Sequence, residues 1–291
     1  MKKHLKKLIP ARWRKDTKRV AVVRLHGAIG VGSPLRPGLS FQTINPAIEK
    51  AFELKGVNAV ALLINSPGGS PVQSALICDR IRRLADEHKV PVYVFMEDVA
   101  ASGGYWMAMA GDEIYADANT IVGSIGVISA SFGFVEAIKK LGVERRVQTS
   151  GENKSILDPF QPKKKTDIER LKSIQSDIHE SFKDLVRKRR GDKLDEKNKD
   201  LFSGAFWTGN QAIELGLIDK LGNMHQVLQE KFGDDVDINY ISAAKKGLLG
   251  RLMPASDAAL SIGALGGLTE GWSGDVLTTL EERSLWARFG L

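Results

Sequence analysis

A serine in a glycine-rich turn is the first residue of this chain that could perform chemistry. Residues 100–106 read AASGGYW, so Ser102 precedes two glycines at the point where an apolar run passes into a small-residue helix. A serine at such a sharp turn exposes its hydroxyl, and the N–H of the next residue, Gly103, can hold an oxyanion. The alternative, on these residues alone, is a structural serine that caps the helix.

A second glycine-rich turn, INSPGGS at residues 64–70, also follows an apolar run. Gly68 and Gly69 allow backbone N–H groups to approach a ligand without interference from side chains. The helix predicted after this turn favours negative charge at its N-terminus. The turn can therefore stabilise a developing oxyanion, although the two glycines alone are more typical of an ordinary tight turn.

A serine nucleophile needs a general base, and the five histidines of the chain offer little choice. Only His26 follows an apolar strand, and no histidine combines with an aspartate in a convincing order for a Ser-His-Asp triad. A desolvated lysine is the other option, because burial lowers the pKa of an amine. Lys154 stands between a glycine turn and a proline-containing apolar stretch, outside the charge runs, although by composition alone it is also an ordinary surface lysine.

Repeated strand–turn–helix units position both turns. The sequence patterns predict strands at 19–25, 58–64, 91–97 and 112–116, and helices at 45–56, 71–87 and 164–190. Continuous apolar runs are typical of parallel strands buried on both faces, so we expect an α/β fold with helices flanking a parallel sheet. Ligands of such sheets bind at the carboxyl ends of the strands, where both glycine-rich turns fall.

Three local predictions accompany this fold. The helix at 45–56 is expected to begin with Asn45 as its cap and Pro46 in its first turn. Residues 143–149 are expected to form a strand. Cys78 is the only cysteine of the chain, and its apolar-periodic surroundings predict a buried helix residue without a catalytic role.

Charge is concentrated at one end of the chain. The net charge is +7, but residues 1–19 contribute +8 and the remaining residues sum to −1. A nucleic-acid-binding fold would spread its basic residues over the folded surface, so we expect no nucleic-acid partner. The basic tail indicates either contact with anionic lipid or a solubilising end.

The order of these features divides the chain into a basic tail at 1–19, a folded domain at 20–242, and a loosely ordered, Gly- and Ala-rich tail at 243–291. No apolar run is typical of a signal peptide or long enough to span a bilayer. The sequence therefore predicts a cytoplasmic protein. If the basic tail contacts anionic lipid, the protein would lie peripherally on the inner membrane.

Four segments stand in a recognisable order and spacing within roughly residues 20–232: INSPGGS, AASGGYWMAMAGDEIYADANTIVGSIGVI, SGENKSILDPF and FWTGNQAIELGLIDKLG. Together they resemble the signal peptide peptidase A family of Ser-Lys peptidases, in the short, single-repeat form. The resemblance implies the Clp protease and crotonase-like fold. It also implies that Ser102 is the nucleophile, that Lys154 is the general base and that Ser124 orients the lysine, with an oxyanion hole formed by Gly68, Gly69 and Gly103.

The resemblance implies a serine endopeptidase that cuts extended apolar peptides such as remnant signal peptides, without metal or organic cofactor. It implies a homo-oligomer, and in some members neighbouring subunits complete one site. A crotonase-type acyl-CoA enzyme is one alternative, with Glu97 and Asp98 as its carboxylates. A catalytically inactive scaffold that binds peptide or membrane is another. A Clp-type triad would need a histidine about two dozen residues after Ser102, and that segment has none.

Overall fold

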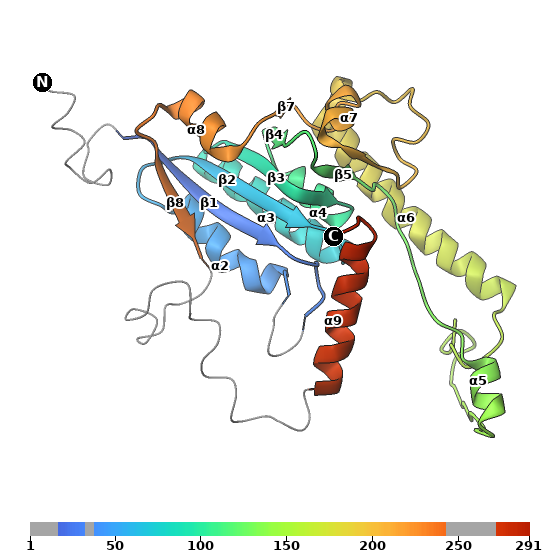
Figure 1. Ribbon diagram of the computed structural model, residues 1–291. Helices are drawn as coiled ribbons and strands as arrows, with labels where there is room; N and C mark the ends of the chain where they lie inside the picture. The colour runs from blue at the N-terminus through green and yellow to red at the C-terminus, as the bar shows by residue number, and fades with distance from the viewer. Residues whose placement is uncertain (1–16, 33–37, 243–271) are drawn as a thin grey trace, which may run out of the picture.

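A mostly parallel, twisted sheet forms the centre of the computed structural model, which describes residues 17–32, 38–242 and 272–291 (Figure 1). Its strands follow the order β6-β5-β3-β2-β1-β8, while β4 pairs with β3 and β7. Among the strand pairs of the described residues, only β5–β6 is antiparallel. The strands are β1 (Arg19–His26), β2 (Val57–Ser66), β3 (Val92–Ala101), β4 (Glu113–Ala116), β5 (Ile121–Gly123), β6 (Phe206–Thr208), β7 (Lys220–Leu221) and β8 (Asp237–Ile241).

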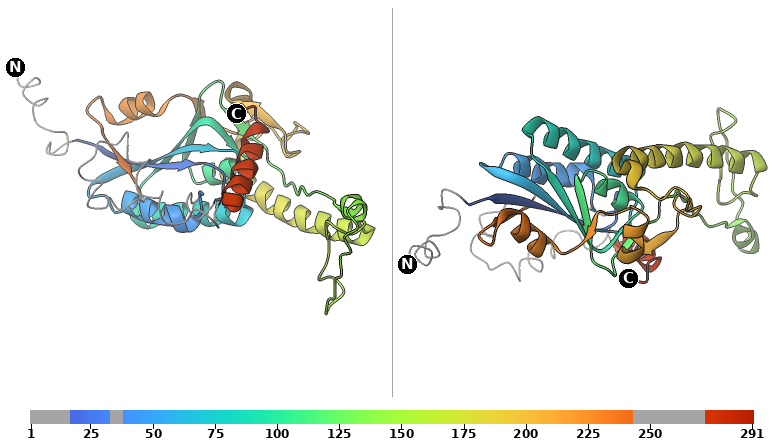
Figure 2. Two further views of the ribbon diagram at one scale, coloured as in Figure 1. Left: turned by 60° about the horizontal axis from the view of Figure 1, so that its bottom comes forward. Right: turned by 90° about the horizontal axis from the view of Figure 1, so that it is seen from above.

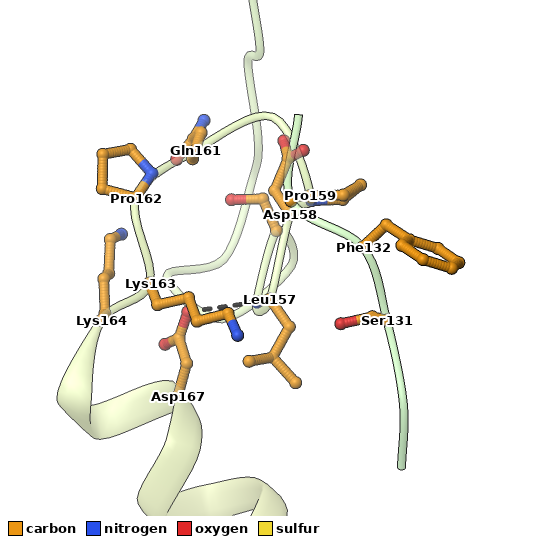
Figure 3. Close-up of a pocket in the computed structure, with 12 residues that line it drawn as sticks. Ser131, Phe132, Leu157, Asp158, Pro159, Gln161, Pro162, Lys163, Lys164 and Asp167 are labelled. Carbon is orange, nitrogen blue, oxygen red and sulfur yellow. Dashed lines mark hydrogen bonds between the residues drawn. The ribbon is translucent and has the colours of Figure 1, made fainter. Parts of the chain in front are cut away.

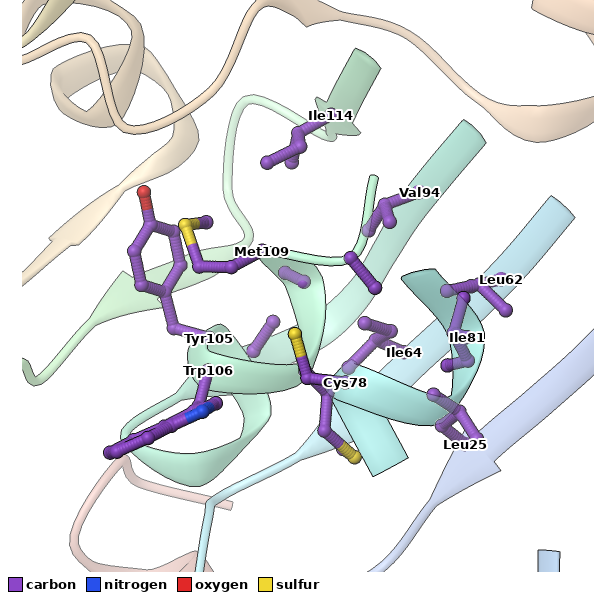
Figure 4. Close-up of a cluster of buried hydrophobic side chains, with 14 of the residues drawn as sticks. Leu25, Leu62, Ile64, Cys78, Ile81, Val94, Tyr105, Trp106, Met109 and Ile114 are labelled. Atoms are coloured by element: carbon purple, nitrogen blue, oxygen red, sulfur yellow. The ribbon is translucent and has the colours of Figure 1, made fainter. Parts of the chain in front are cut away.

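Helices cover both faces of this sheet, which confirms the predicted α/β architecture (Figure 2). On one face lie α2 (Phe41–Phe52), α3 (Pro71–His88) and α4 (Gly103–Ala108), and on the other lies α8 (Met224–Phe232). Strands β1 to β3 are therefore buried on both sides, which explains why their sequences are almost continuously apolar. The larger core cluster lies between the sheet and α2 to α4, and it includes Cys78, 1% exposed as predicted (Figure 4).

One helix begins earlier than its sequence pattern predicts. Asn45 does not cap α2; the helix begins four residues before it, and Pro46 lies inside it. Ser40 is the cap, because its side chain accepts the N–H of Thr43 while the Thr43 hydroxyl accepts the N–H of Ser40. This reciprocal capping fixes the helix start, and the proline that was expected to mark it is tolerated further along.

The segment between β5 and the long helix α6 (Lys165–Arg190) projects away from the sheet (Figures 1 and 2). We call residues 127–163 the arm. It contains the short helix α5 (Val135–Lys140), but residues 143–149 form no strand, so that prediction is wrong. The apolar residues of 143–149 have no sheet edge beside them in the arm, and Val143 and Val147 stay exposed.

The body of α6 is fixed to the domain by a buried ion pair. The guanidinium of Arg190 contacts the Asp219 carboxylate at 2.9 Å, and their side chains are 2% and 11% exposed. Lys193 reaches the same carboxylate at 2.6 Å. Beyond them lie α7 (Gly209–Glu214) and α8, the two short helices that complete the body of the domain. The long helix is therefore anchored at its C-terminal end, while its N-terminal end extends with the arm.

Both predicted tails lie largely outside the described residues, namely 1–16 and 243–271, so lipid contact by the basic tail stays a prediction. Within the predicted C-terminal tail, residues 272–287 form a single helix, α9 (Trp272–Ala287), of 16 residues. Within 17–32, 38–242 and 272–291, none of the helices is both long and apolar enough to span a bilayer.

Candidate active site

Ser102 occupies a strained turn at the carboxyl end of β3. Its backbone has φ 52° and ψ −119°, a region that residues with a Cβ seldom adopt. Its N–H donates to the carbonyl of Gly123 at 2.8 Å, and its own carbonyl accepts the N–H of Trp106 at 2.9 Å. The Ser102 side chain makes no capping hydrogen bond to α4. Helix capping is therefore not the reason for this serine, and the hydroxyl is available for other chemistry.

The turn after β2 packs directly against Ser102. A Cβ at Gly68 would lie 2.7 Å from the Cβ of Ser102, and one at Gly69 would lie 2.1 Å from the carbonyl oxygen of Ile29. Both glycines have positive φ, 102° and 142°. Ile29 holds the turn from the other side, because its N–H donates to Gly68 and its carbonyl accepts from Ser70, each at 2.8 Å. Only glycine fits at both positions, which explains the doublet.

Two backbone N–H groups, those of Gly69 and Gly103, lie close together beside the serine. A Cβ at Gly103 would lie 3.4 Å from the nitrogen of Gly69, so the two residues are close neighbours. Neither N–H has an acceptor in the described part of the chain. The N–H of Gly68, by contrast, donates to the hydroxyl of Ser66 at 3.2 Å. Gly69 and Gly103 therefore offer free donors of the kind that hold an oxyanion, while Gly68 provides the close approach.

Ser124 lies at the neighbouring strand end. In the β3–β5 register Ala101 is opposite Gly123, so Ser102 and Ser124 are the next residues on adjacent strands. Ser124 also has positive φ, 53°, and its N–H donates to the carbonyl of Ala205 at 2.7 Å. The residue is 5% exposed. The structure thus brings together Ser102, Ser124 and the three glycines at one edge of the sheet.

Lys154 lies elsewhere, in the turns of the arm. Leu157 lies three residues after Lys154, and its N–H donates to the Asp167 carboxylate at 3.2 Å. This hydrogen bond attaches this part of the arm to the first turn of α6. A ring nitrogen of His179 contacts the carbonyl of Ile125, next to Ser124, at 3.1 Å. Asp167 and His179 are twelve residues apart in α6, which is about 18 Å along the helix axis. Within one chain, Lys154 is therefore not brought to Ser102.

A single copy of the chain leaves Lys154 in contact with solvent. Its side chain is exposed. The cavity of the arm is small, about 40 Å³, and is lined by residues such as Ser131, Leu157 and Asp167 (Figure 3). The dominant contacts of the arm are internal, including an Arg145–Asp158 ion pair at 2.9 Å and stacking of Phe134 on Phe160.

The residues of the alternative chemistries are engaged in other contacts. Glu97 pairs with Arg24 at 3.0 Å, and Asp98 accepts a hydrogen bond from Asn65 at 2.6 Å, so neither predicted crotonase carboxylate is unpartnered. His26 is exposed and its ring lies against Trp286. No group of three or more potential metal ligands occurs in residues 17–32, 38–242 and 272–291. The supporting role of Ile29 was not predicted, and no signal in the sequence distinguishes it from other core residues.

Comparison with known proteins matches the chain to a peptidase family. The sequence model of peptidase family S49 matches residues 85–236. The chain is 35% identical to Protease 4 of Haemophilus influenzae over 217 residues, which cover 73% of this chain and 34% of that protein. It is 32% identical over 212 residues to a Synechocystis protein that is named a putative protease, and the match covers 73% of each chain.

A longer relative carries a different name. The protein named Na(+)/H(+) antiporter NhaA in Brucella abortus is 55% identical over 294 residues, covering 99% of this chain. The aligned part is 39% of that protein, so the chain spans about two fifths of its length. Among solved structures, a mutant of the 1510-N membrane-bound stomatin-specific protease superposes with a TM-score of 0.46 at 15% identity, covering 78% of this chain and 98% of that one.

Proposed function

This chain belongs to peptidase family S49, and from that premise we propose that it is a serine endopeptidase with Ser102 as its nucleophile. The observation that carries the proposal is the turn at Ser102, where a strained backbone leaves the hydroxyl uncapped beside the N–H groups of Gly69 and Gly103. The proposed substrates are extended apolar peptides, such as remnant signal peptides. This substrate class comes from the family resemblance of the sequence.

The proposed chemistry is acyl transfer. The uncharged amine of Lys154 takes the proton of the Ser102 hydroxyl, and the alkoxide attacks the carbonyl carbon of the scissile bond. The N–H groups of Gly69 and Gly103 stabilise the oxyanion, each by about 3–4 kcal/mol in the transition state. The ammonium of Lys154 then protonates the leaving amine, and water hydrolyses the acyl ester to release the second product and restore Ser102.

We infer that the proposed base comes from a second copy of the chain. The distance of about 18 Å along α6 separates the arm from the strand ends within one copy. The arm also exposes large apolar side chains, with Phe132 at 81% and Ile128 and Leu141 largely exposed. A neighbouring copy that covers these side chains would remove their apolar area from water. We therefore place the arm against a neighbouring copy, where Lys154 would meet the Ser102 of that copy in a homo-oligomer.

The antiporter name of the Brucella relative is not carried over to this chain. The match to peptidase family S49 falls inside the segment that the two proteins share. The larger part of the Brucella protein lies outside that segment. The shared segment thus supports the peptidase proposal and gives no evidence of transport by this chain.

The decisive experiment is incubation of the protein with a synthetic signal peptide, with the products identified by mass spectrometry. We expect cleavage within the apolar part of the peptide by the wild-type protein and none by Ser102→Ala. A Ser131→Ala variant, altered in an exposed serine of the arm, is the matched control and should cleave normally. Equal cleavage by wild type and Ser102→Ala would refute Ser102 as the nucleophile.

A further inference from the structure

The helix α9 and the residues after it pack one face on the domain. Their half-buried positions recur at spacings of three and four, which is the periodicity of one helix face. They are Thr278, Glu282, Leu285, Trp286 and Phe289. On the opposite side of the helix Leu280 is more than half exposed, and so is Leu291, which follows the end of the helix. The segment is therefore seated on the protein surface along a definite stripe.

This stripe touches the domain at two separate places. The ring of Trp286 lies 5.8 Å from the ring of His26, and Glu282 Oε1 lies 3.8 Å from where a Cβ of Gly27 would be. Both contacts are at the carboxyl end of β1. Further along, the ring of Phe289 packs edge-on against Phe206 at 5.2 Å. Phe206 is opposite Gly123 in the β5–β6 register, so this second contact is beside the carboxyl end of β5.

The strand order decides what lies between these two contacts. In the sheet, β2, β3 and β5 stand between β1 and β6. Their carboxyl ends lead directly to Gly68, Ser102 and Ser124. A segment that contacts β1 at one point and β6 at another must pass over this row of strand ends. Figure 1 shows α9 at that edge of the sheet.

We propose that residues 278–291 form an autoinhibitory strap that covers the approach to Ser102 and has to move aside before an extended peptide can bind. The inference rests on the proposed peptidase function. The anchors of the strap are aromatic contacts at the surface, and each such contact shifts an equilibrium by a factor of about 2 to 10. The covered state is therefore favoured only moderately, so an apolar peptide that competes for the same edge can displace the strap.

Removing both anchors should open the site. We expect Trp286→Ala/Phe289→Ala to raise kcat/KM for a fluorogenic apolar peptide about 5- to 10-fold. The control is Leu280→Ala/Leu291→Ala, which removes two apolar side chains from the exposed side of the same segment and should leave the rate unchanged. An unchanged or lower rate in the anchor variant would show that the segment is a wall of the substrate groove or is unrelated to it.

A second measurement does not depend on catalysis. In a Ser102→Cys background, the rate of alkylation by iodoacetamide reports access to residue 102. We expect the same increase of about 5- to 10-fold when Trp286 and Phe289 are replaced. Cys78 gives little background, because it is 1% exposed and burial raises its pKa to about 12.

The two readouts separate this inference from the proposed function. Faster alkylation in the anchor variant, without peptide cleavage by any form of the protein, would support the strap and contradict the peptidase. Suppose instead that the wild-type protein cleaves the peptide, but Ser102→Cys is alkylated at the same rate with and without the Trp286 and Phe289 replacements. That result would contradict the strap and leave the peptidase proposal intact.

Discussion

At the carboxyl edge of the sheet, backbone hydrogen bonds on both sides fix the turn that holds Ser102, and the neighbouring glycines leave no space for a side chain. The arm, which carries Lys154, keeps most of its side chains exposed and contacts mainly itself and the first turn of α6. Donors for an oxyanion must be in place before charge develops, so they belong on a rigid element. A base that is delivered to a neighbouring copy can instead lie on an element that projects from the domain, such as the arm.

The largest expected effect concerns the arm. Replacing Lys154 with Ala removes the proposed general base and should lower kcat by about 10²- to 10⁴-fold. Lys163→Ala, which alters another exposed lysine of the arm, should have no such effect. Steady-state cleavage of a fluorogenic peptide measures both. A fully active Lys154→Ala enzyme would end the Ser-Lys assignment.

Mixing two inactive variants tests whether Lys154 acts on the Ser102 of another copy. If the base comes from a neighbouring copy, an assembly formed from Ser102→Ala and Lys154→Ala chains contains sites with both intact groups. We therefore expect the mixture to recover a substantial fraction of wild-type activity, whereas each variant alone stays inactive. Absence of recovery, in a mixture shown to co-assemble, would place both groups within one chain.

Substitution in the turn that holds Gly69 should lower kcat nearly as much as loss of Lys154. A Cβ at Gly69 would overlap the carbonyl of Ile29, so Gly69→Ala must displace the turn and its N–H donor. The loss of one such donor costs about 10²- to 10³-fold in kcat. Gly133→Ala in the arm is the matched control, because a Cβ there meets nothing within 4 Å. Equal activity of the two variants would remove Gly69 from the oxyanion hole.

The anchored end of α6 gives a prediction for stability. Asp219→Asn leaves the buried guanidinium of Arg190 without its carboxylate and should lower the free energy of unfolding by about 3 kcal/mol in urea titrations. Glu144→Gln, at an exposed ion pair of the arm, should leave it unchanged. Similar values for the two variants would contradict the anchoring role of the Arg190–Asp219 pair.

The same pair makes stability depend on pH. Burial raises the pKa of the Asp219 carboxyl, but hydrogen bonds from Arg190 and Lys193 outweigh it and hold the pKa below the usual value. The stabilisation is therefore complete above the unfolded pKa, about 3.9, and is lost as the pH falls through the lower folded value. The difference in stability between wild type and Asp219→Asn should shrink accordingly below about pH 4.

The smallest expected effect concerns the serine beside the nucleophile. If Ser124 orients the incoming amine, Ser124→Ala removes one hydrogen bond to a basic group and should lower kcat about tenfold. KM should change little, because the proposed contact is made to the base and not to the peptide. A change confined to KM would instead assign Ser124 to substrate binding.

Much of the sheet was predictable because β1, β2 and β3 are buried on both faces, so their apolar runs are unambiguous. The placement of Ser102 after such a run followed directly. The start of α2 was not predictable from Pro46, because the capping interaction of Ser40 with Thr43 decides it. The position of Lys154 depends on the direction in which α6 projects, and this tertiary property leaves no periodic signal. The covered face of α9 depends likewise on contacts with distant strands.

The pairing of β1 with β8 has a consequence for how the domain is made. Arg19 is paired with Asp237, so β1 can complete its pairing only after a strand more than two hundred residues later in the chain has been synthesised. At a synthesis rate of about 5–20 residues per second, one edge of β1 remains open for roughly 10 to 40 seconds on the ribosome. That open edge can template wrong pairing with other nascent chains, so the interval before β8 emerges exposes the chain to aggregation.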